Sequence, residues 1–211
     1  MFVTPGDRPP AVLTARVREV LRGGVTAVLL REPQLPPADR VALAGELRAL
    51  TAEHGALLLV NRESALARSC GADGVHTGFG GPEVAALRRD APGLCVGRSC
   101  HWPVEPDDLA ADYVLVSPFR PTGRSHPRPL LRNEQARAVL ELPGMPPAVA
   151  LGGLSAHDVP ELPAGLCGVA AVRALADAPE ARRAAEGLLA AVRERLRGGT
   201  RFGPPAPVAA A

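Results

Sequence analysis

The sequence is poor in aromatic residues and has no long apolar run. Phe, Trp and Tyr make up 3% of the 211 residues, whereas hydrophobic residues as a whole make up 46%. We therefore expect a core packed mainly with alanine, valine and leucine. No apolar segment reaches the roughly 18 residues of a membrane span, so we expect no membrane contact.

The chain also lacks an excess of charge of either sign. Its 24 Lys and Arg residues and 22 Asp and Glu residues leave a net charge of +2. That balance, and the absence of aromatic residues between the arginines, argues against a nucleic-acid partner. The first residues, MFVTPGDRPP, have neither the basic start nor the apolar stretch of a signal peptide. The expected location is therefore cytoplasmic.

The four cysteines form no metal-binding or redox pattern. None belongs to a CxxC pair, and no Cys and His spacing suits a zinc site. Cys95 and Cys167 lie inside apolar runs, which predicts that both are buried thiols. The sequence thus predicts no metal site.

Short aliphatic runs alternate with longer segments rich in Ala, Leu, Arg and Glu, which is typical of βα units on a parallel sheet. The pattern predicts strands at 1–4, 25–31, 56–61, 73–76, 94–98, 113–116, 148–151 and 168–172. It predicts helices that end near residue 22 and that cover 38–54, 64–69, 82–89, 106–111, 133–140, 156–162 and 179–196.

Eight such units predict an α/β fold, a single (β/α)8 TIM barrel over residues 1–197, because continuous aliphatic strands are buried on both faces. An open doubly wound sheet is the competing fold. It usually has five or six strands, and no GxGxxG follows the first strand here. Residues 198–211 are rich in Gly, Pro and Ala, which predicts a disordered tail.

In a barrel of this kind, the loops after the strands build the site. Gly152 and Gly153 follow the seventh strand, and Ala171 and Val172 end the eighth. Glycines let backbone N–H groups approach a phosphate, and phosphate sites in these barrels commonly lie at strands seven and eight. We therefore predict phosphate binding at Gly152, Gly153, Ala171 and Val172; a plain tight turn is the alternative.

Polar residues at three other strand ends are further candidates for the site. Arg31 ends the second strand and can grip a phosphate in a bidentate manner, or form a salt bridge with Glu32 or Glu63. His76 ends the fourth strand and is either a ligand-binding residue or a satisfied core histidine. Ser99 and His101 follow the fifth strand, where they could bind an anion or shuttle a proton; a structural role for His101 is the alternative.

The segment from Arg120 to Arg128 concentrates positive charge and hydrogen-bonding groups. Thr122 and His126 belong to it, and it could close over an anion and exclude water. The alternative is a solvated basic loop.

Together these residues resemble the thiamine phosphate synthase/TenI superfamily. The resemblance runs in order from about residue 1 to residue 176, and rests on GVTAVLLRE at 24–32, Asn61, GVH at 74–76, GRSCH at 97–101, DYV at 112–114, Ser117-Pro118, Pro121-Thr122, Gly152-Gly153 and GVA at 168–170. It implies a barrel that binds a phosphorylated thiazole or pyrimidine, with Asn61 among the binding residues. The family's GxSxH segment corresponds to GRSCH and implies roles for Ser99 and His101.

The synthase branch couples an aminopyrimidine diphosphate to a thiazole phosphate and holds Mg²⁺ with two acids. In this sequence Arg62 stands at the place of the first acid, and GFGG at 78–81 has no acid at the place of the second. Leu29 and Pro33 replace the Gln and Lys of the QxRxK pattern, and the lysine of the strand-six loop has no clear match. An arginine repels a metal ion that prefers carboxylates. Arg62 is the residue that could neutralise the diphosphate instead.

The chain resembles the TenI branch more closely. That branch also lacks the metal acids and shares the Leu-Leu-Arg-Glu strand end and the Gly-Arg-Ser-x-His segment. Its characterised members isomerise a thiazole carboxylate phosphate to the aromatic tautomer without a metal, using a histidine just after strand six. Pro118 stands at that place here, so we predict that His101 or His126 supplies the acid or base.

Three functions follow from the resemblance. The first is a metal-independent, TenI-type proton transfer with His101, His126 and Ser99 near the reacting atoms and no cofactor. The second is a divergent thiamine phosphate synthase, with Mg²⁺ only if that activity is retained. The third is a non-catalytic binder of phosphorylated ligands or a regulatory protein. A homodimer is possible for any of them.

Overall fold

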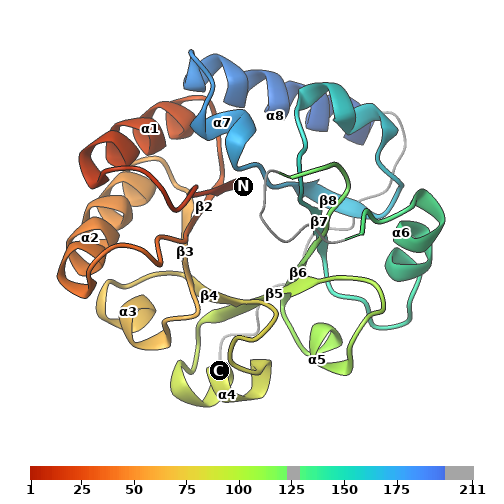
Figure 1. The fold of residues 1–211 in the computed structure, drawn as a ribbon, viewed down its shortest axis with the longest axis horizontal. Helices are drawn as coiled ribbons and strands as arrows, with labels where there is room; N and C mark the ends of the chain where they lie inside the picture. Colours follow the sequence, from red (N-terminus) through yellow and green to blue (C-terminus); the bar gives the residue numbers. More distant parts are fainter. Residues whose placement is uncertain (123–128, 198–211) are drawn as a thin grey trace.

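The computed structural model of the chain describes residues 1–122 and 129–197. Its strands form a ring with the helices on the outside (Figure 1). Neighbouring strands are parallel and follow the chain order: β1 Phe2–Val3, β2 Ala27–Leu30, β3 Leu57–Asn61, β4 Gly74–Thr77, β5 Cys95–Cys100, β6 Tyr113–Val116, β7 Ala148–Ala150 and β8 Leu166–Val169. The predicted TIM barrel is therefore confirmed.

The ring closes between its first and last strands. Ala171 pairs with Phe2, the Val3 amide donates to the Ala171 carbonyl at 3.0 Å, and the Ala171 amide donates to the Met1 carbonyl at 3.0 Å. The closure leaves β1 without an unpaired edge, as in other closed barrels.

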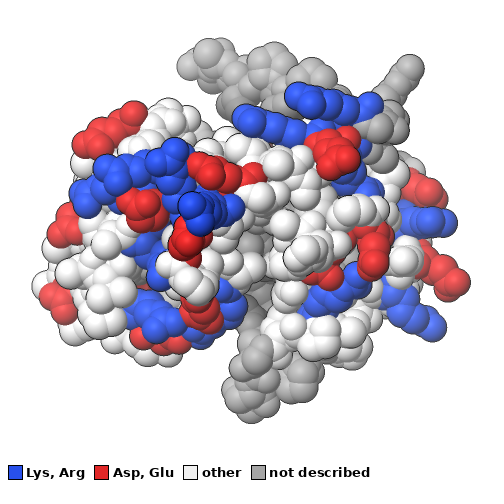
Figure 2. All heavy atoms as spheres, turned by 90° about the horizontal axis from the view of Figure 1, so that it is seen from above, with Lys and Arg blue, Asp and Glu red and all other residues white. Residues whose placement is uncertain are grey.

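The helices cover the outer face of the barrel. They are α1 Pro10–Arg22, α2 Pro37–Glu53, α3 Ser64–Ser69, α4 Val84–Asp90, α5 Pro106–Leu109, α6 Asn133–Leu140, the 3-10 helix Ala156–Glu161, α7 Arg173–Ala176 and α8 Ala181–Arg197. On the face shown in Figure 2, basic and acidic side chains are interspersed. No helix of the described residues is long and apolar enough to cross a membrane.

The apolar side chains form two layers because successive residues of a strand point to opposite faces. Val3, Leu29, Leu59, Leu115 and Ala170 form a small cluster inside the barrel. Their neighbours along the strands belong to a larger cluster between strands and helices, which includes Phe2, Val28, Leu58, Val114 and Val169.

Predictions for strands, for one helix and for two cysteines are corrected. Strand β5 continues through Cys100, β8 covers Leu166–Val169 rather than 168–172, and the short helix α7 was not predicted. Ala171 and Val172 therefore follow the eighth strand and do not end it. Cys95 is half-buried and Cys167 is exposed, contrary to the prediction of buried thiols. Cys95 begins β5 and Cys167 is the second residue of β8, and Leu57, which begins β3, is likewise 50% exposed. Side chains at these amino-terminal strand ends are thus only partly covered.

Candidate functional site

Strand alternation decides which polar residues face the inside of the barrel. In β5, Gly97 and Ser99 face inward, whereas Arg98 and Cys100 face the helices. Arg98 is buried and pairs with Glu105 at 2.7 Å, Asp107 at 2.7 Å and Asp108 at 2.6 Å. Arg98 therefore links the α5 region to β5 through ion pairs, and its role is structural.

A chain of three hydrogen-bonding side chains crosses strands β4 to β6. The His76 Nδ1 lies 3.0 Å from the Tyr113 hydroxyl, and its Nε2 lies 3.0 Å from the Ser99 Oγ. Ser99 is half-buried at the carboxyl end of β5, while His76 is 2% exposed. His76 is thus a fully satisfied core histidine that also contacts a predicted site residue.

Burial, together with the positive charges of Arg62 and Arg98, lowers the pKa of His76 from 6.5 to about 3. The ring is therefore neutral at physiological pH. A neutral imidazole has one donor and one acceptor nitrogen, which matches its two hydroxyl neighbours.

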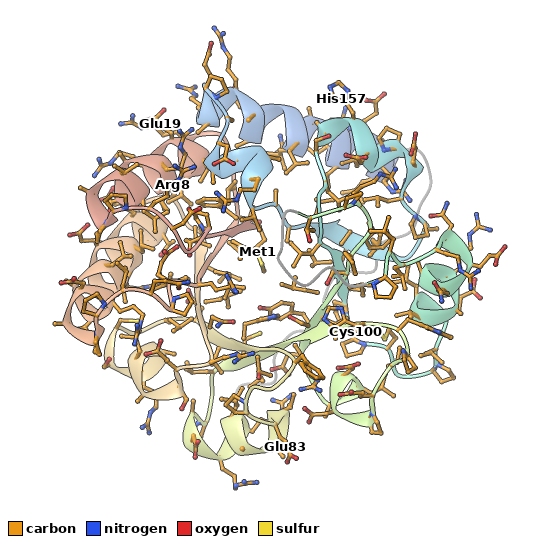
Figure 3. The ribbon with its side chains drawn as sticks, in the orientation of Figure 1. Met1, Arg8, Glu19, Glu83, Cys100 and His157 are labelled. Atoms are coloured by element: carbon orange, nitrogen blue, oxygen red, sulfur yellow. The ribbon has the colours of Figure 1, made fainter. Side chains whose placement is uncertain are left out.

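This pKa shift predicts loss of stability in mild acid. Below pH 6.5 the unfolded chain protonates His76 and the folded chain does not, so stability falls as pH drops from 6.5 toward about 3. Between pH 7 and pH 5 the contribution of this group is about 2 kcal/mol. We expect His76→Gln to reduce the acid loss by that amount in urea titrations at the two pH values. The exposed His157, at the periphery in Figure 3, provides the control, because His157→Gln leaves the buried ring in place. An equal acid loss in the wild type and the His76 variant would contradict the prediction.

Gly97 makes the contact between Tyr113 and His76 possible. In the sheet register Gly97 lies between these two residues, paired with His76 on β4 and with Tyr113 on β6. A Cβ at Gly97 would overlap the Tyr113 ring. The bare backbone of Gly97 therefore lets the ring cross β5.

Arg62 follows β3 in a conformation that is uncommon for a residue with a side chain. Its φ is 66°, in the left-handed region that favours glycine. The Arg62 amide donates to the His76 carbonyl at 2.7 Å, and its guanidinium donates to the Phe79 carbonyl at 2.6 Å. These bonds hold an exposed positive charge beside the loop after β4.

Arg31 is half-buried directly after β2, and its amide donates to the Thr4 Oγ1 at 2.7 Å. The neighbouring Glu32 is buried and accepts a hydrogen bond from the Gly6 amide at 2.9 Å. Burial raises the pKa of Glu32, and its hydrogen bonds oppose that rise. The loop after β1 is thus held against the end of β2, next to Arg31.

The glycine pair packs against the loop after β6. Gly152 and Gly153 have φ values of 105° and 64°, which favour glycine. A Cβ on Gly152 would lie 2.8 Å from the Cα of Pro118, and one on Gly153 would lie 2.8 Å from the Cβ of Arg120. The close approach therefore serves packing between two loops, a reason for glycine that the sequence did not reveal. Among the described residues, neither glycine amide has a recorded hydrogen-bond partner.

The two residues predicted to bind phosphate after β8, Ala171 and Val172, differ in their contacts. Both backbone groups of Ala171 bond to β1, so its amide is engaged within the barrel. Val172 precedes α7 and its side chain packs on the inner cluster. The predicted phosphate contact at this turn accordingly rests on Val172 rather than on the Ala171 amide.

His101 is oriented by the end of β6. Its Nδ1 lies 2.8 Å from the Ser117 carbonyl and 3.4 Å from the Ser117 hydroxyl. A carbonyl only accepts, so Nδ1 carries the proton and Nε2 of the neutral ring carries a lone pair.

The remaining predicted residues are less tightly placed. Asn61 ends β3, half-buried, in register with His76. Thr122 is half-buried on the loop after β6. His126 lies outside the described residues.

The side chains of the candidate site do not match what Mg²⁺ requires. The predicted residues on β3 to β5 offer an amide, a guanidinium, an imidazole and a hydroxyl, and Glu63 beside them pairs with Arg40 at 2.9 Å. The described part of the chain holds no group of three or more His, Cys, Asp and Glu residues arranged for a metal ion. Mg²⁺ in proteins usually takes one or two carboxylates.

Comparison with known proteins connects this chain to one family. A family model described as thiamine monophosphate synthase matches residues 1–175. A putative thiamine-phosphate synthase of Geobacter sulfurreducens is 36% identical over 192 residues, covering 88% of this chain and 89% of that protein. A thiamine-phosphate synthase of Thermus thermophilus is 35% identical over 205 residues, covering 94% of this chain and 96% of that protein.

Solved structures of other proteins have the same barrel fold. A thiamine phosphate pyrophosphorylase from Pyrococcus furiosus has a TM-score of 0.78 and 28% identity, covering 92% of this chain and 95% of its own. A 3-hexulose-6-phosphate synthase from Salmonella typhimurium has a TM-score of 0.63 at 15% identity, covering 92% and 98%. The second likeness supports the barrel fold alone.

Proposed function

Since the chain belongs to the thiamine monophosphate synthase family, we propose that it binds a thiazole phosphate at the carboxyl ends of its strands and moves a proton on that ligand without a metal ion. The activity would be that of a thiazole tautomerase of the TenI type. Such an isomerisation removes one proton and returns one. It therefore needs a phosphate grip and an acid–base group, but neither a second substrate nor a leaving group.

The observation that carries the proposal is the hydrogen bond from His101 Nδ1 to the Ser117 carbonyl, 2.8 Å long. It fixes the tautomer that has a lone pair on Nε2, the form that a general base requires. The imidazole would take the proton from the thiazole and return it as the imidazolium.

Two further features support the phosphate grip. The amides of Gly152 and Gly153 have no recorded partner among the described residues, and oriented amides of this kind bind anions. Arg31 adds a guanidinium at the end of β2, which suits bidentate phosphate binding.

Synthase activity is the second candidate, favoured by the names of the relatives and by the exposed Arg62 guanidinium. Three observations weigh against it. The carboxylates that would hold Mg²⁺ are missing, and the QxRxK pattern is lost. The sequence also contains no lysine, since all 24 residues counted as Lys or Arg are arginines. No other lysine could therefore replace those that the synthase pattern requires.

The proposal is tested with the wild-type chain. We expect conversion of the thiazole carboxylate phosphate tautomer in the presence of a metal chelator, with solvent deuterium entering the product. We expect no thiamine phosphate from aminopyrimidine diphosphate and thiazole phosphate, with or without Mg²⁺. Thiamine phosphate formation would establish the synthase instead, and tight binding without turnover of either kind would establish a binding protein.

Arg31→Met should weaken thiazole phosphate binding by roughly 10- to 100-fold, because a charge-assisted hydrogen bond contributes about 1.5–3 kcal/mol. Isothermal titration calorimetry measures the change. Arg22→Met is the control, since Arg22 ends α1 at the opposite end of the barrel and pairs with Glu19 at 2.7 Å. Equal affinities of the two variants would remove Arg31 from the site.

A further inference from the structure

The direction of the hydrogen bonds between Tyr113, His76 and Ser99 can be worked out from their surroundings. The Tyr113 hydroxyl points into the barrel, where burial raises its pKa, so it stays protonated. Among the described residues, its hydrogen-bond partner is His76 Nδ1, 3.0 Å away. A buried hydroxyl proton without an acceptor is costly, so Tyr113 donates and Nδ1 accepts.

The neutral ring then carries its proton on Nε2. His76 is 2% exposed and its pKa is lowered to about 3, which leaves one proton to be shared between the two nitrogens. With Nδ1 accepting, Nε2–H donates to the Ser99 Oγ, 3.0 Å away. The serine oxygen is thereby used as an acceptor, and its own proton is left to point elsewhere.

Ser99 is not fully enclosed by the protein. It is half-buried at the carboxyl end of β5, and its neighbour across the sheet edge is Gly78, whose missing Cβ would lie 3.1 Å from the Ser99 Oγ. The Arg62 guanidinium lies at the same edge, on the Phe79 carbonyl. Two donors, one near the end of β5 and one directly after β3, thus lie at this end of the barrel.

We propose that Tyr113 and His76 are positioning residues that fix the Ser99 hydroxyl as a hydrogen-bond donor toward an acceptor atom of the bound ligand. Gly97 is part of this arrangement, because the Tyr113 ring can reach His76 only if residue 97 has no side chain. The inference rests on the proposed function only for the identity of the ligand. The acceptor is a phosphate oxygen or a ring nitrogen, because the hydroxyl proton is the part of Ser99 that the bond from His76 leaves free to point at a ligand.

The ligand-free protein tests the first half of the inference. Long-range ¹H–¹⁵N correlation spectra of the full ¹⁵N-labelled chain report which ring nitrogen carries the proton, and the His76→Gln spectrum assigns the signals. We expect the Nε2–H tautomer for His76, unchanged between pH 8 and pH 5. The Nδ1–H tautomer, or an average of the two, overturns the inference whatever the ligand is.

A matched pair of variants tests the second half. The Gln amide nitrogen takes the place of Nε2 and still donates to Ser99, whereas Asn reaches only the place of Nδ1. We expect His76→Asn and Ser99→Ala to weaken binding of pyrophosphate or of thiazole phosphate about 10-fold, and His76→Gln to stay within about 3-fold of the wild type. Equal losses in the Gln and Asn variants, or full affinity for both ligands in Ser99→Ala, overturn it. A wild type that binds neither ligand would refute the proposed function, while the tautomer measurement would still decide this inference.

Discussion

Replacing His101 with Gln should lower the rate of thiazole tautomerisation by about 100-fold or more, while the affinity for thiazole phosphate changes little. A positioned acid–base group contributes roughly 10²–10⁴-fold to a proton transfer. Glutamine keeps a polar side chain of similar reach but cannot take up a proton at neutral pH. Initial rates at saturating ligand, together with calorimetric binding, separate the loss of chemistry from a loss of binding.

His54→Gln is the matched control for this experiment. The His54 Nδ1 also lies 3.0 Å from a backbone carbonyl, that of Leu50, but His54 caps the far end of α2, away from the candidate site. Its replacement should leave the rate unchanged. If the double variant His101→Gln, His126→Gln turned over as fast as the wild type, histidine catalysis at this barrel would be refuted.

Elements with a simple aliphatic pattern were predictable from the sequence. Helices Ser64–Ser69 and Asn133–Leu140 and strand Tyr113–Val116 have the predicted boundaries. The largest strand error falls on β8, where the register with β7 shifts between Ala148 and Val149. Such an irregularity depends on pairing between distant segments, so the local pattern of residues 166–172 could not reveal it.

The candidate site was predictable in position but not in its internal contacts. Strand ends pointed to His76, Ser99 and His101, and the structure places the first two in contact at 3.0 Å. Tyr113 was missed, because it starts β6 and looked like an ordinary strand residue. The sequence did hold one clue: Tyr113 is the only tyrosine of the chain, and the residue beside it on β5 is a glycine within a strand.

Alternation along GRSCH at 97–101 gives its residues different structural roles. Gly97 gives room to Tyr113, Ser99 receives the hydrogen bond from His76, and His101 is held by Ser117. Arg98, between them, faces outward and fastens the α5 region with its three carboxylates. The end of β5 and the residue after it thus provide both candidate site residues and their outer support, because residues along a strand alternate between its two faces.

Gly97→Ala should lower the free energy of unfolding by about 3 kcal/mol, at the upper end of the usual cost of overpacking a core. The added methyl group would overlap the Tyr113 ring, and the ring packs on the inner cluster, so it cannot move aside freely. Urea or thermal unfolding measures the loss. The displaced ring would also leave His76 Nδ1, so the Nε2–H tautomer signal of His76 should weaken in the same variant.

Gly45→Ala provides the control, because Gly45 lies within α2 and a Cβ there meets nothing within 4 Å. Alanine is the better helix former by about 1 kcal/mol, so this variant should be slightly more stable than the wild type. Tyr113→Ala in the Gly97→Ala background should cost much less than in the wild type, since the two side chains compete for the same space. If the two substitutions were instead additive in a double-mutant cycle, Gly97 would not be needed to make room for the Tyr113 ring. The proposed series of contacts from Gly97 through Tyr113 and His76 to Ser99 would then be wrong at its first step.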